Sequence, residues 1–226
     1  MIYGLVGNVG SGKTISLVRT IHSKGQSEVI HVDDDRDFSW IPLHLDTRFY
    51  CNFAVKSKNA IRLKKEDIIM KTLDDKGKHP KYQVNWEFWK DAQSKGNFCI
   101  CLDEVSGLFH SRRAMTSWNI AGTDFIQQIR KITHGSKYHH IVLVTQKLER
   151  LDIAWRDLLH GIVSCEMRGD MIIRHHFHGI KNKDIHSAFN MHEMGEKTYD
   201  FRDCFYAPDY FKYYDTYEVI GDSPYL

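Results

Sequence analysis

The first fourteen residues combine glycine, lysine and threonine at a spacing suited to phosphate. The segment 7–14 reads GNVGSGKT and fits the pattern G-x-x-x-x-G-K-[ST] at every position. Its glycines permit turns and a close approach that side chains would block, so successive backbone N–H groups can point at phosphate oxygens. In this interpretation Lys13 reaches the β- and γ-phosphates, and the Thr14 hydroxyl ligates Mg²⁺. The sequence therefore predicts a loop for a nucleoside triphosphate, made of Gly7, Asn8, Val9, Gly10, Ser11, Gly12, Lys13 and Thr14.

Two adjacent acids further along the chain point to hydrolysis. The apolar run Phe98–Leu102 has the length of a buried parallel strand, and it ends at Asp103 and Glu104. Acids at the end of a core strand are costly unless a cation is near. This is the Walker B arrangement, in which Asp103 holds Mg²⁺ and Glu104 orients and activates the attacking water. Together with the phosphate loop, the pair favours Mg²⁺-dependent cleavage of the β–γ bond.

Strands and helices must hold these residues in place. A short apolar strand, Ile2–Val6, precedes the phosphate loop, and a helix follows it with one apolar face, made of Ile15, Leu17, Val18 and Ile21. A longer helix is predicted over 118–132, where apolar residues advance by three and four and Arg130 lies off the apolar stripe. A further buried strand, 140–146, ends at the polar residue Gln146.

The rest of the chain reads as short elements around this frame. We expect short strands at 49–51 and 61–63, a polar loop at 73–81 and a helix at 151–159. Two closing strands are expected at 161–165 and 171–173. Asn85 is a suitable N-cap for a short helix. The tail from Tyr199 carries no catalytic signature and is expected to wrap over the domain.

Composition limits the possible classes of protein. A chain of 226 residues holds one α/β domain, or one domain with a small appendage. The net charge is +2, so any DNA contact must come from a local patch or from assembly of several subunits. The odd number of cysteines, five, favours reduced thiols in a cytoplasmic setting. No apolar run of about 18 residues occurs, so we expect no membrane span.

Two charged or polar segments leave their roles open. The basic residues of segment 56–65 can contact a phosphate backbone, although a charge run is more often a solvated face. His176 and His178 have strand spacing and can share a face, but no cysteine or carboxylate follows at a recognisable ligand interval. We therefore regard a structural metal there as the weaker interpretation.

The three segments GNVGSGKT, FCICLDE and IRKITHGSKYHHIVLVTQ together resemble the additional-strand P-loop ATPases of the FtsK–HerA superfamily. Within it the chain is most similar to the Zot-like and viral genome-packaging ATPases, on its opening Met-Ile-Tyr strand and its late Tyr214-Asp215-Thr216. The resemblance implies an α/β, RecA-like fold with a mostly parallel central sheet flanked by helices and with β-hairpin additions. We expect residues 1–180 to form the P-loop ATPase domain and residues 181–226 a C-terminal extension packed on it.

The resemblance also implies a mechanism. Catalysis would fall to Glu104, Lys13, Gln146 and Arg130. In such ATPases the residue at the position of Gln146 senses or positions the γ-phosphate. Arg130 would be an arginine finger given in trans to the next subunit, with Arg112, Arg113, Arg150 and Arg156 as rivals.

The function so implied is an ATP-dependent, DNA-translocating motor, most directly a viral genome-packaging ATPase that uses ATP and Mg²⁺. Expected partners are double- or single-stranded DNA, further copies of the chain in a ring, and a portal, capsid or membrane assembly protein. The expected location is the host cytoplasm or, transiently, the virion. Two alternatives remain: a Zot-like phage assembly or extrusion ATPase, and a small-molecule kinase with the same loop. Zot-type proteins usually continue into a membrane span, which favours packaging here.

Overall fold

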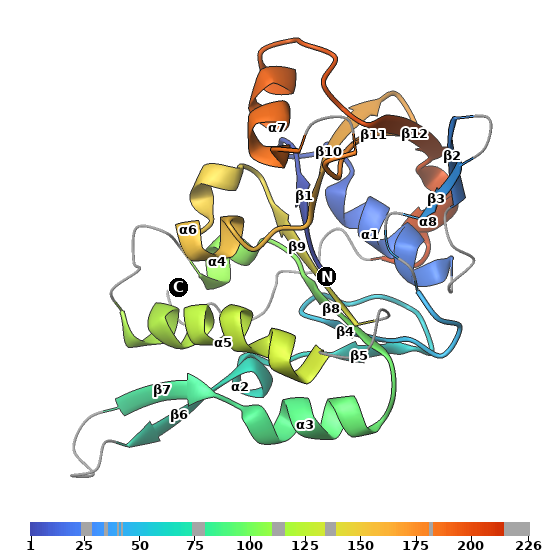
Figure 1. Cartoon of the computed structure of the whole chain (residues 1–226). Coiled ribbons are helices and arrows are strands. Elements are labelled where there is room, and N and C mark those ends of the chain that lie inside the picture. The colour runs from blue at the N-terminus through green and yellow to red at the C-terminus, as the bar shows by residue number, and fades with distance from the viewer. Residues whose placement is uncertain are drawn as a thin grey trace.

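One mixed sheet of eight strands organises the computed structural model, which describes residues 1–23, 29–33, 36–39, 41, 43–73, 80–109, 116–133, 139–180 and 183–214. Across the sheet the order is β12-β11-β10-β1-β9-β8-β4-β5 (Figure 1). The strands are β1 (Ile2–Val6), β4 (Arg48–Cys51), β5 (Ala60–Arg62), β8 (Phe98–Leu102), β9 (His140–Thr145), β10 (Gly161–Arg168), β11 (Met171–Phe177) and β12 (Phe201–Tyr206). Neighbours from β10 to β5 pair in parallel, and β11 and β12 are antiparallel.

The strand order confirms the predicted fold class. β9 lies between β1 and β8, so one strand separates the phosphate loop from the Asp103–Glu104 pair. Because β1, β4, β8 and β9 are parallel, their carboxyl ends meet at one edge of the sheet. The residues that directly follow these strands are therefore neighbours in space, and these include Gly7, Asp103 and Gln146.

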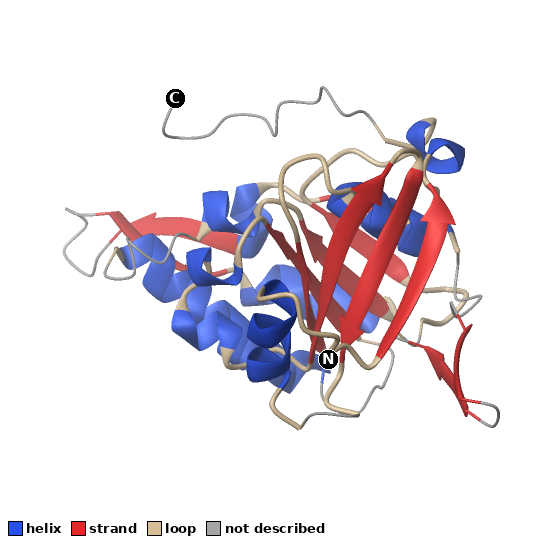
Figure 2. Cartoon of the chain, turned by 90° about the horizontal axis from the view of Figure 1, so that it is seen from above, coloured by secondary structure: helices blue, strands red, loops and turns tan. Residues whose placement is uncertain are grey.

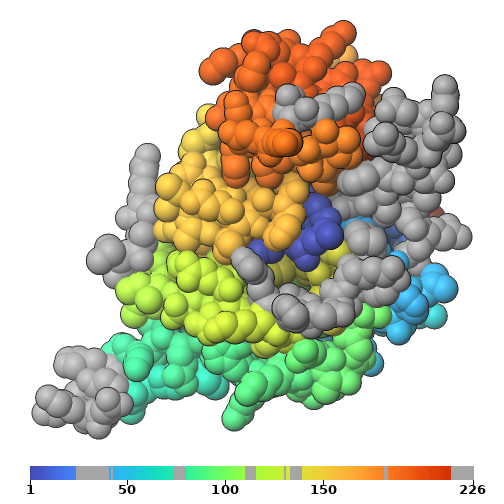
Figure 3. Space-filling model, in the orientation of Figure 1, coloured from blue at the N-terminus to red at the C-terminus, as the bar shows by residue number. Residues whose placement is uncertain are grey.

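Helices cover both faces of the sheet (Figure 2). Alternate residues of β1 point to opposite faces, so Ile2 and Val6 join one core cluster, and Tyr3 and Leu5 join the other. The first cluster includes residues of α3 (Trp86–Ser94), α5 (Ser117–Thr133), α6 (Ile153–Arg156) and α7 (Ile185–Glu193). The opposite face is covered by α1 (Lys13–His22), with α8 (Pro208–Phe211) beside it. In the face shown by the space-filling view (Figure 3), a small part of the dark blue N-terminal segment is visible.

Two hairpins stand outside the main sheet, in accord with the expected additions. β2 (Val29–Asp33) pairs with β3 (Arg36–Ser39), and β6 (Ile69–Leu73) pairs with β7 (Pro80–Val84). The second hairpin lies against α5 (Figure 1), and the short helix α2 (Lys65–Ile68) leads into it. The loop expected over 73–81 is too long, because the residues at both of its ends belong to strands that pair across the hairpin. Residues 74–79 lie outside the described part of the chain.

The helix expected over 151–159 is also shorter than its apolar spacing suggested. Only α6, four residues long, is helical, and it begins after Asp152, whose carboxylate accepts from the Ala154 N–H at 2.9 Å. The chain then leaves the helix because the His160 N–H bonds to the carbonyl of Ile2 at 2.7 Å, which starts the pairing of β10 with β1. Leu159 is buried, but it lies in the connection between α6 and β10 and not in a helix.

The C-terminal part adds one strand that the sequence pattern did not reveal. β12 pairs with β11 at the far edge of the sheet, and β11 itself runs on to Phe177 instead of ending at Ile173. Exposed and less exposed residues alternate along β12, but the charged Asp203 lies between Phe201 and Phe205 on the inward face, so the apolar alternation in the sequence is interrupted. The division of the chain at residue 180 stays a prediction.

A buried ion cluster joins this added region to α1. Asp203 on β12 accepts from Arg174 Nε at 2.9 Å and pairs with His176 Nε2 at 2.8 Å. Arg19 of α1 approaches the same carboxylate at 3.5 Å. Burial alone would raise the pKa of Asp203, but the hydrogen bonds from His176 and Arg174 outweigh it and hold the pKa well below its usual range. The negative charge of Asp203 is thus balanced by side chains of the same chain.

No helix among the described residues combines the length and apolarity needed to cross a bilayer. Cys99 and Cys101 share one face of β8, with their sulfurs 3.8 Å apart, and both are buried in the core. Each is a free thiol.

Candidate active site

The phosphate loop connects β1 to the N-terminus of α1. Lys13 is the first residue of α1, it is 5% exposed, and its Nζ donates to the carbonyl of Asn8 at 2.8 Å. The ammonium group is therefore held across the loop, over the turn that would surround a phosphate. The helix N-terminus adds its own positive end to this place.

Two glycines of the loop are required by their surroundings. Gly12 has a φ of 85°, and a Cβ there would meet Ile172 of β11. A Cβ at Gly7 would lie 2.5 Å from the carbonyl oxygen of Cys165 on β10. The loop is thus packed against the β10–β11 hairpin, which explains why only glycine fits at both positions.

Thr14 and Asp103 meet as the sequence predicted that metal ligands would. Thr14 Oγ1 donates to Asp103 Oδ2 at 2.8 Å. Asp103 is 3% exposed, and burial raises its pKa to about 6, with the Thr14 hydrogen bond acting in the opposite direction. A buried carboxylate beside a hydroxyl, with no salt bridge to a basic side chain among the described residues, is a hard oxygen donor set that fits Mg²⁺.

Asn52 supports this carboxylate, and sequence reasoning missed it. Its amide makes two hydrogen bonds to the backbone of Asp103: Oδ1 accepts from the Asp103 N–H at 2.6 Å, and Nδ2 donates to the Asp103 carbonyl at 2.8 Å. Asn52 directly follows β4, the strand beside β8. The sequence does place a polar residue at the end of the predicted strand 49–51. It does not show that this strand lies beside the strand that ends at Asp103.

Glu104 has an unusual backbone. Its φ is 45° and its ψ 46°, the left-handed region that a non-glycine residue rarely adopts, and it caps the short helix α4 (Val105–Leu108). Such a conformation costs about 1–3 kcal/mol and persists where the surroundings impose it, often at functional sites. The Glu104 N–H donates to Asp103 Oδ1 at 3.0 Å, which ties the two acids together.

Gln146 lies next to Glu104, as its place at the end of β9 required. Its Nε2 donates to Glu104 Oε1 at 3.4 Å, and its Oε1 accepts from Arg150 Nη1 at 2.8 Å. Arg150 belongs to the 3₁₀ turn Leu148–Arg150 that follows β9. The structure therefore brings Lys13, Thr14, Asp103, Glu104 and Gln146 to one edge of the sheet, and adds Arg150 to them.

The predicted arginine finger does not join this group within one chain. Arg130 lies in the last turns of α5, which ends shortly before β9 begins at the amino edge of the sheet. The phosphate loop is at the opposite, carboxyl edge. Among its rivals, Arg156 is in α6, and Arg112 and Arg113 lie outside the described residues.

A cavity of about 310 Å³ opens beside the phosphate loop. It lies between the carboxyl ends of β1 and β9, the hairpin β10–β11, and α7, and Gly7, Asn8 and Gln146 are part of its wall. His175 of β11 also lines it, and burial lowers the pKa of this histidine to about 4, so it is neutral at pH 7. The cavity adjoins the first turn of the loop and the side of Gln146, and Lys13, Thr14, Asp103 and Glu104 are not part of its wall.

The two histidines considered for a metal, His176 and His178, do share a face. Their rings are stacked with centroids 5.8 Å apart, and His176 belongs to the buried ion cluster through Asp203. Within the described residues, no group of three or more histidine, cysteine, aspartate and glutamate side chains is arranged to hold a metal ion.

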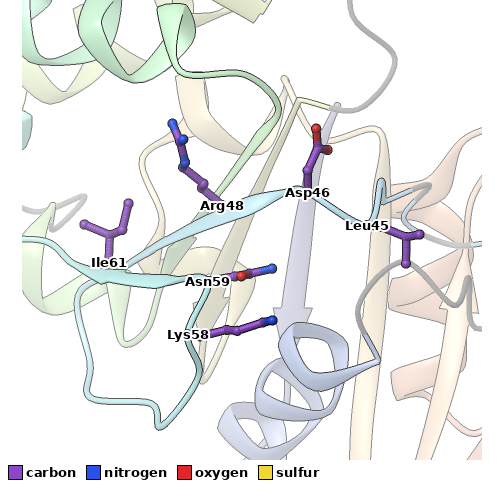
Figure 4. A pocket seen from close by; sticks show the side chains of 6 residues that line it. All are labelled: Leu45, Asp46, Arg48, Lys58, Asn59 and Ile61. Carbon is purple, nitrogen blue, oxygen red and sulfur yellow. The ribbon is translucent and has the colours of Figure 1, made fainter.

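A second cavity, of about 340 Å³, lies at the amino ends of β4 and β5 (Figure 4). Arg48 and Lys58 line it together with Asp46 and Asn59. It is at the edge of the sheet opposite the phosphate loop, so it contains none of the predicted site residues.

Comparisons with known proteins give one family and several solved structures. The family model described as zonular occludens toxin (Zot) matches residues 1–218. The N-terminal domain of zonular occludens toxin from Neisseria meningitidis is similar in structure, with a TM-score of 0.52 and 16% identity, over 95% of this chain and 98% of that one. The DNA-packaging ATPase B204 of Sulfolobus turreted icosahedral virus gives a TM-score of 0.43 and 12% identity, over 93% of this chain and 94% of that one. A search of curated proteins gives no match.

Proposed function

Since the chain belongs to the zonular occludens toxin (Zot) family, we propose that it is an ATP hydrolase whose turnover drives the movement of DNA in viral genome packaging. The observation that carries the hydrolase proposal is the contact between Glu104 and Gln146 beside the Thr14–Asp103 pair. A nucleotide-binding loop alone needs no such pair of water-handling groups. Their position at the same edge of the sheet as the Thr14–Asp103 pair supports a role beside the γ-phosphate of a bound nucleotide.

Each residue then has a definite role. Lys13 and the loop amides would hold the phosphates, and Thr14 and Asp103 would hold Mg²⁺, which when bound would supply positive charge to the transferred phosphoryl group. Glu104 orients the attacking water and accepts its proton, and Gln146 donates from its amide toward the same place. The left-handed backbone of Glu104 supports this role, because its carboxylate lies beside Gln146 in that conformation.

Two substitutions test the hydrolase proposal. Lys13→Ala should remove nucleotide binding and turnover together, whereas Glu104→Gln should lower kcat by about 100-fold or more and leave nucleotide binding intact. Lys197→Ala, an exposed lysine far along the chain, is the matched control and should behave as the wild type. Turnover at the wild-type rate in both site variants would contradict the proposal.

The kinase alternative is separable by its product. A kinase transfers the γ-phosphoryl group to an acceptor and must keep water out, so a carboxylate and an amide placed to handle water would be harmful. Release of inorganic phosphate with no phosphorylated nucleoside supports the hydrolase; the reverse supports the kinase.

The completed site requires a second subunit in this proposal. Arg130 of one copy would act on the phosphates held by the next, because its own phosphate loop is at the other edge of the sheet. Such an arginine contributes on the order of 10³–10⁵ in rate. Mixing Arg130→Ala subunits with Glu104→Gln subunits should restore part of the turnover. A site on an Arg130→Ala subunit that receives the arginine of a Glu104→Gln neighbour combines an intact Glu104 with an intact Arg130, whereas the reverse order lacks both.

The DNA part of the proposal rests on the sequence resemblance and on exposed cations. Lys56, Lys58 and Lys64 are exposed on either side of the edge strand β5, and Lys58 lines the cavity of Figure 4. Replacing these three lysines by alanine should reduce DNA affinity and lower the salt dependence of binding by about one unit of slope for each phosphate that a lysine had neutralised. An unchanged slope would place the DNA elsewhere.

A phage assembly or extrusion ATPase is the second candidate, and the family match favours it. It shares the hydrolysis step and differs in the partner that receives the DNA. Sedimentation of the full chain with procapsids during phage production supports packaging, and flotation with host membranes supports extrusion.

A further inference from the structure

Arg150 makes a contact that no sequence pattern predicted. Its Nη1 donates to Gln146 Oε1 at 2.8 Å, and Gln146 in turn donates to Glu104. Within the part of the chain that the structure describes, no carboxylate forms an ion pair with Arg150. The three side chains therefore form a row that ends at the carboxylate assigned to water activation.

The chemistry of the three groups permits only one orientation of the middle one. A guanidinium group has donors and no acceptor, and an ionised carboxylate has acceptors and no donor. The amide of Gln146 satisfies both neighbours only when its oxygen faces Arg150 and its NH₂ faces Glu104. Without Arg150, the amide can turn by 180° and present its oxygen to the Glu104 carboxylate, which is repulsive.

The backbone that carries Arg150 is fixed. Leu148 and Leu151 on either side are buried in the core, 4% and 1% exposed. The turn is closed by the Arg150 N–H to the Lys147 carbonyl at 3.2 Å and by Thr145 Oγ1 to the same carbonyl, also at 3.2 Å. Because the backbone of Arg150 is already ordered, only its side chain loses conformational entropy when the guanidinium group binds the amide.

We propose that Arg150 is a positioning residue that acts within its own subunit and fixes the amide of Gln146 so that its NH₂ faces Glu104. This inference rests on the proposed hydrolysis and adds a residue to it. It also assigns Arg150 a role in cis, which separates it from the arginine expected from a neighbouring subunit.

Steady-state ATP hydrolysis by substituted full-length chains tests the proposal. Arg150→Ala should lower kcat about tenfold and change KM by less than about twofold, as expected when one charge-assisted hydrogen bond made through another residue is removed. Arg150→Lys should recover most of the rate, because an ammonium group also only donates. Arg150→Gln should stay as slow as alanine, because an amide both donates and accepts and fixes no orientation.

A double substitution tests whether Arg150 acts through Gln146. Gln146→Ala should slow turnover, and adding Arg150→Ala to it should slow it no further, because the group that Arg150 orients is already missing. A full additive loss, or a rate of Arg150→Ala equal to that of the exposed control Arg202→Ala, would overturn the inference. Unchanged melting temperatures exclude a folding defect.

Mixing Arg150→Ala subunits with Glu104→Gln subunits distinguishes cis from trans. No recovery of turnover is expected, because the subunits with intact Glu104 all lack Arg150; recovery would make Arg150 the trans arginine and refute the proposal. If the wild type hydrolyses no ATP, the proposed function fails. If the wild type hydrolyses ATP and Lys13→Ala does not, the proposed hydrolysis stands, and the Arg150 variants then test the positioning role alone.

Discussion

Two clusters of charged side chains lie near α1, and they differ in how the charge of the buried carboxylate is balanced. Asp203, at the β11–β12 edge, is surrounded by Arg174, His176 and Arg19, and its pKa is held well below the usual range. Asp103, at the carboxyl edge, has a hydroxyl and a second acid for neighbours, and burial raises its pKa to about 6. Both carboxylates are largely buried, so burial alone does not separate structure from function.

The difference lies in what completes each cluster. The chain supplies every partner of Asp203, so this cluster stabilises the fold and needs no ligand. At Asp103 the chain supplies oxygen atoms and leaves the charge to be balanced from outside, which is how a cation site differs from an ion pair. The comparison predicts opposite responses to the same substitution in the two places.

The largest effect is expected at the internally balanced cluster. Asp203→Asn leaves Arg174 buried without its counter-charge and should lower the free energy of unfolding by about 3–5 kcal/mol. Urea denaturation measures this, with the exposed Asp209→Asn as the control that should change little. A loss below about 1 kcal/mol would mean that the cluster is not a stabilising element.

The same carboxylate should set part of the acid sensitivity. Its pKa in the folded state is lower than in the unfolded chain, where it is about 3.9, so its contribution is present above about pH 4 and disappears as the pH falls further. The stability difference between wild type and Asp203→Asn should therefore be constant from about pH 7 to pH 5 and shrink toward about pH 3. A difference independent of pH over this range would show that the effect is steric.

At Asp103, on the carboxyl edge of the sheet, the corresponding substitution should act in the other direction. Asp103→Asn removes a buried charge that is not balanced within the chain and should raise the free energy of unfolding by about 1–2 kcal/mol in Mg²⁺-free buffer at pH 7. It should abolish Mg²⁺-dependent turnover at the same time. Denaturation and phosphate release on the same sample measure both, and a destabilised variant would remove the contrast with Asp203.

The smallest expected change concerns the strained residue beside it. Glu104→Gly relieves a positive φ and should stabilise the chain by about 1 kcal/mol, while turnover is lost with the carboxylate. Glu104→Ala separates the two effects, because it removes the carboxylate and keeps the strain. Equal stability of the glycine and alanine variants would show that the backbone at this position stores no strain.

Much of the fold was predictable because its strongest patterns are local. The runs Ile2–Val6, Phe98–Leu102 and the strand from His140 are continuous apolar segments of strand length, and each lies in the sheet as expected. β12 was missed because the charged Asp203 interrupts the apolar residues of its inward face. The helix after Leu151 was overestimated because pairing of His160 with β1 ends it early. Both errors arise where a distant strand overrides a local preference.

The candidate site divides along the same line. The sequence by itself determined the phosphate loop, the two acids and Gln146, because a motif fixes their types and the ends of parallel strands fix their edge. Only the tertiary structure decided that Asn52 holds the Asp103 backbone, that Arg150 faces Gln146, and that Asp203 is balanced where Asp103 is not. The physical reason is that a charge or an amide takes its role from the partners around it, and those partners come from strands far apart in the chain.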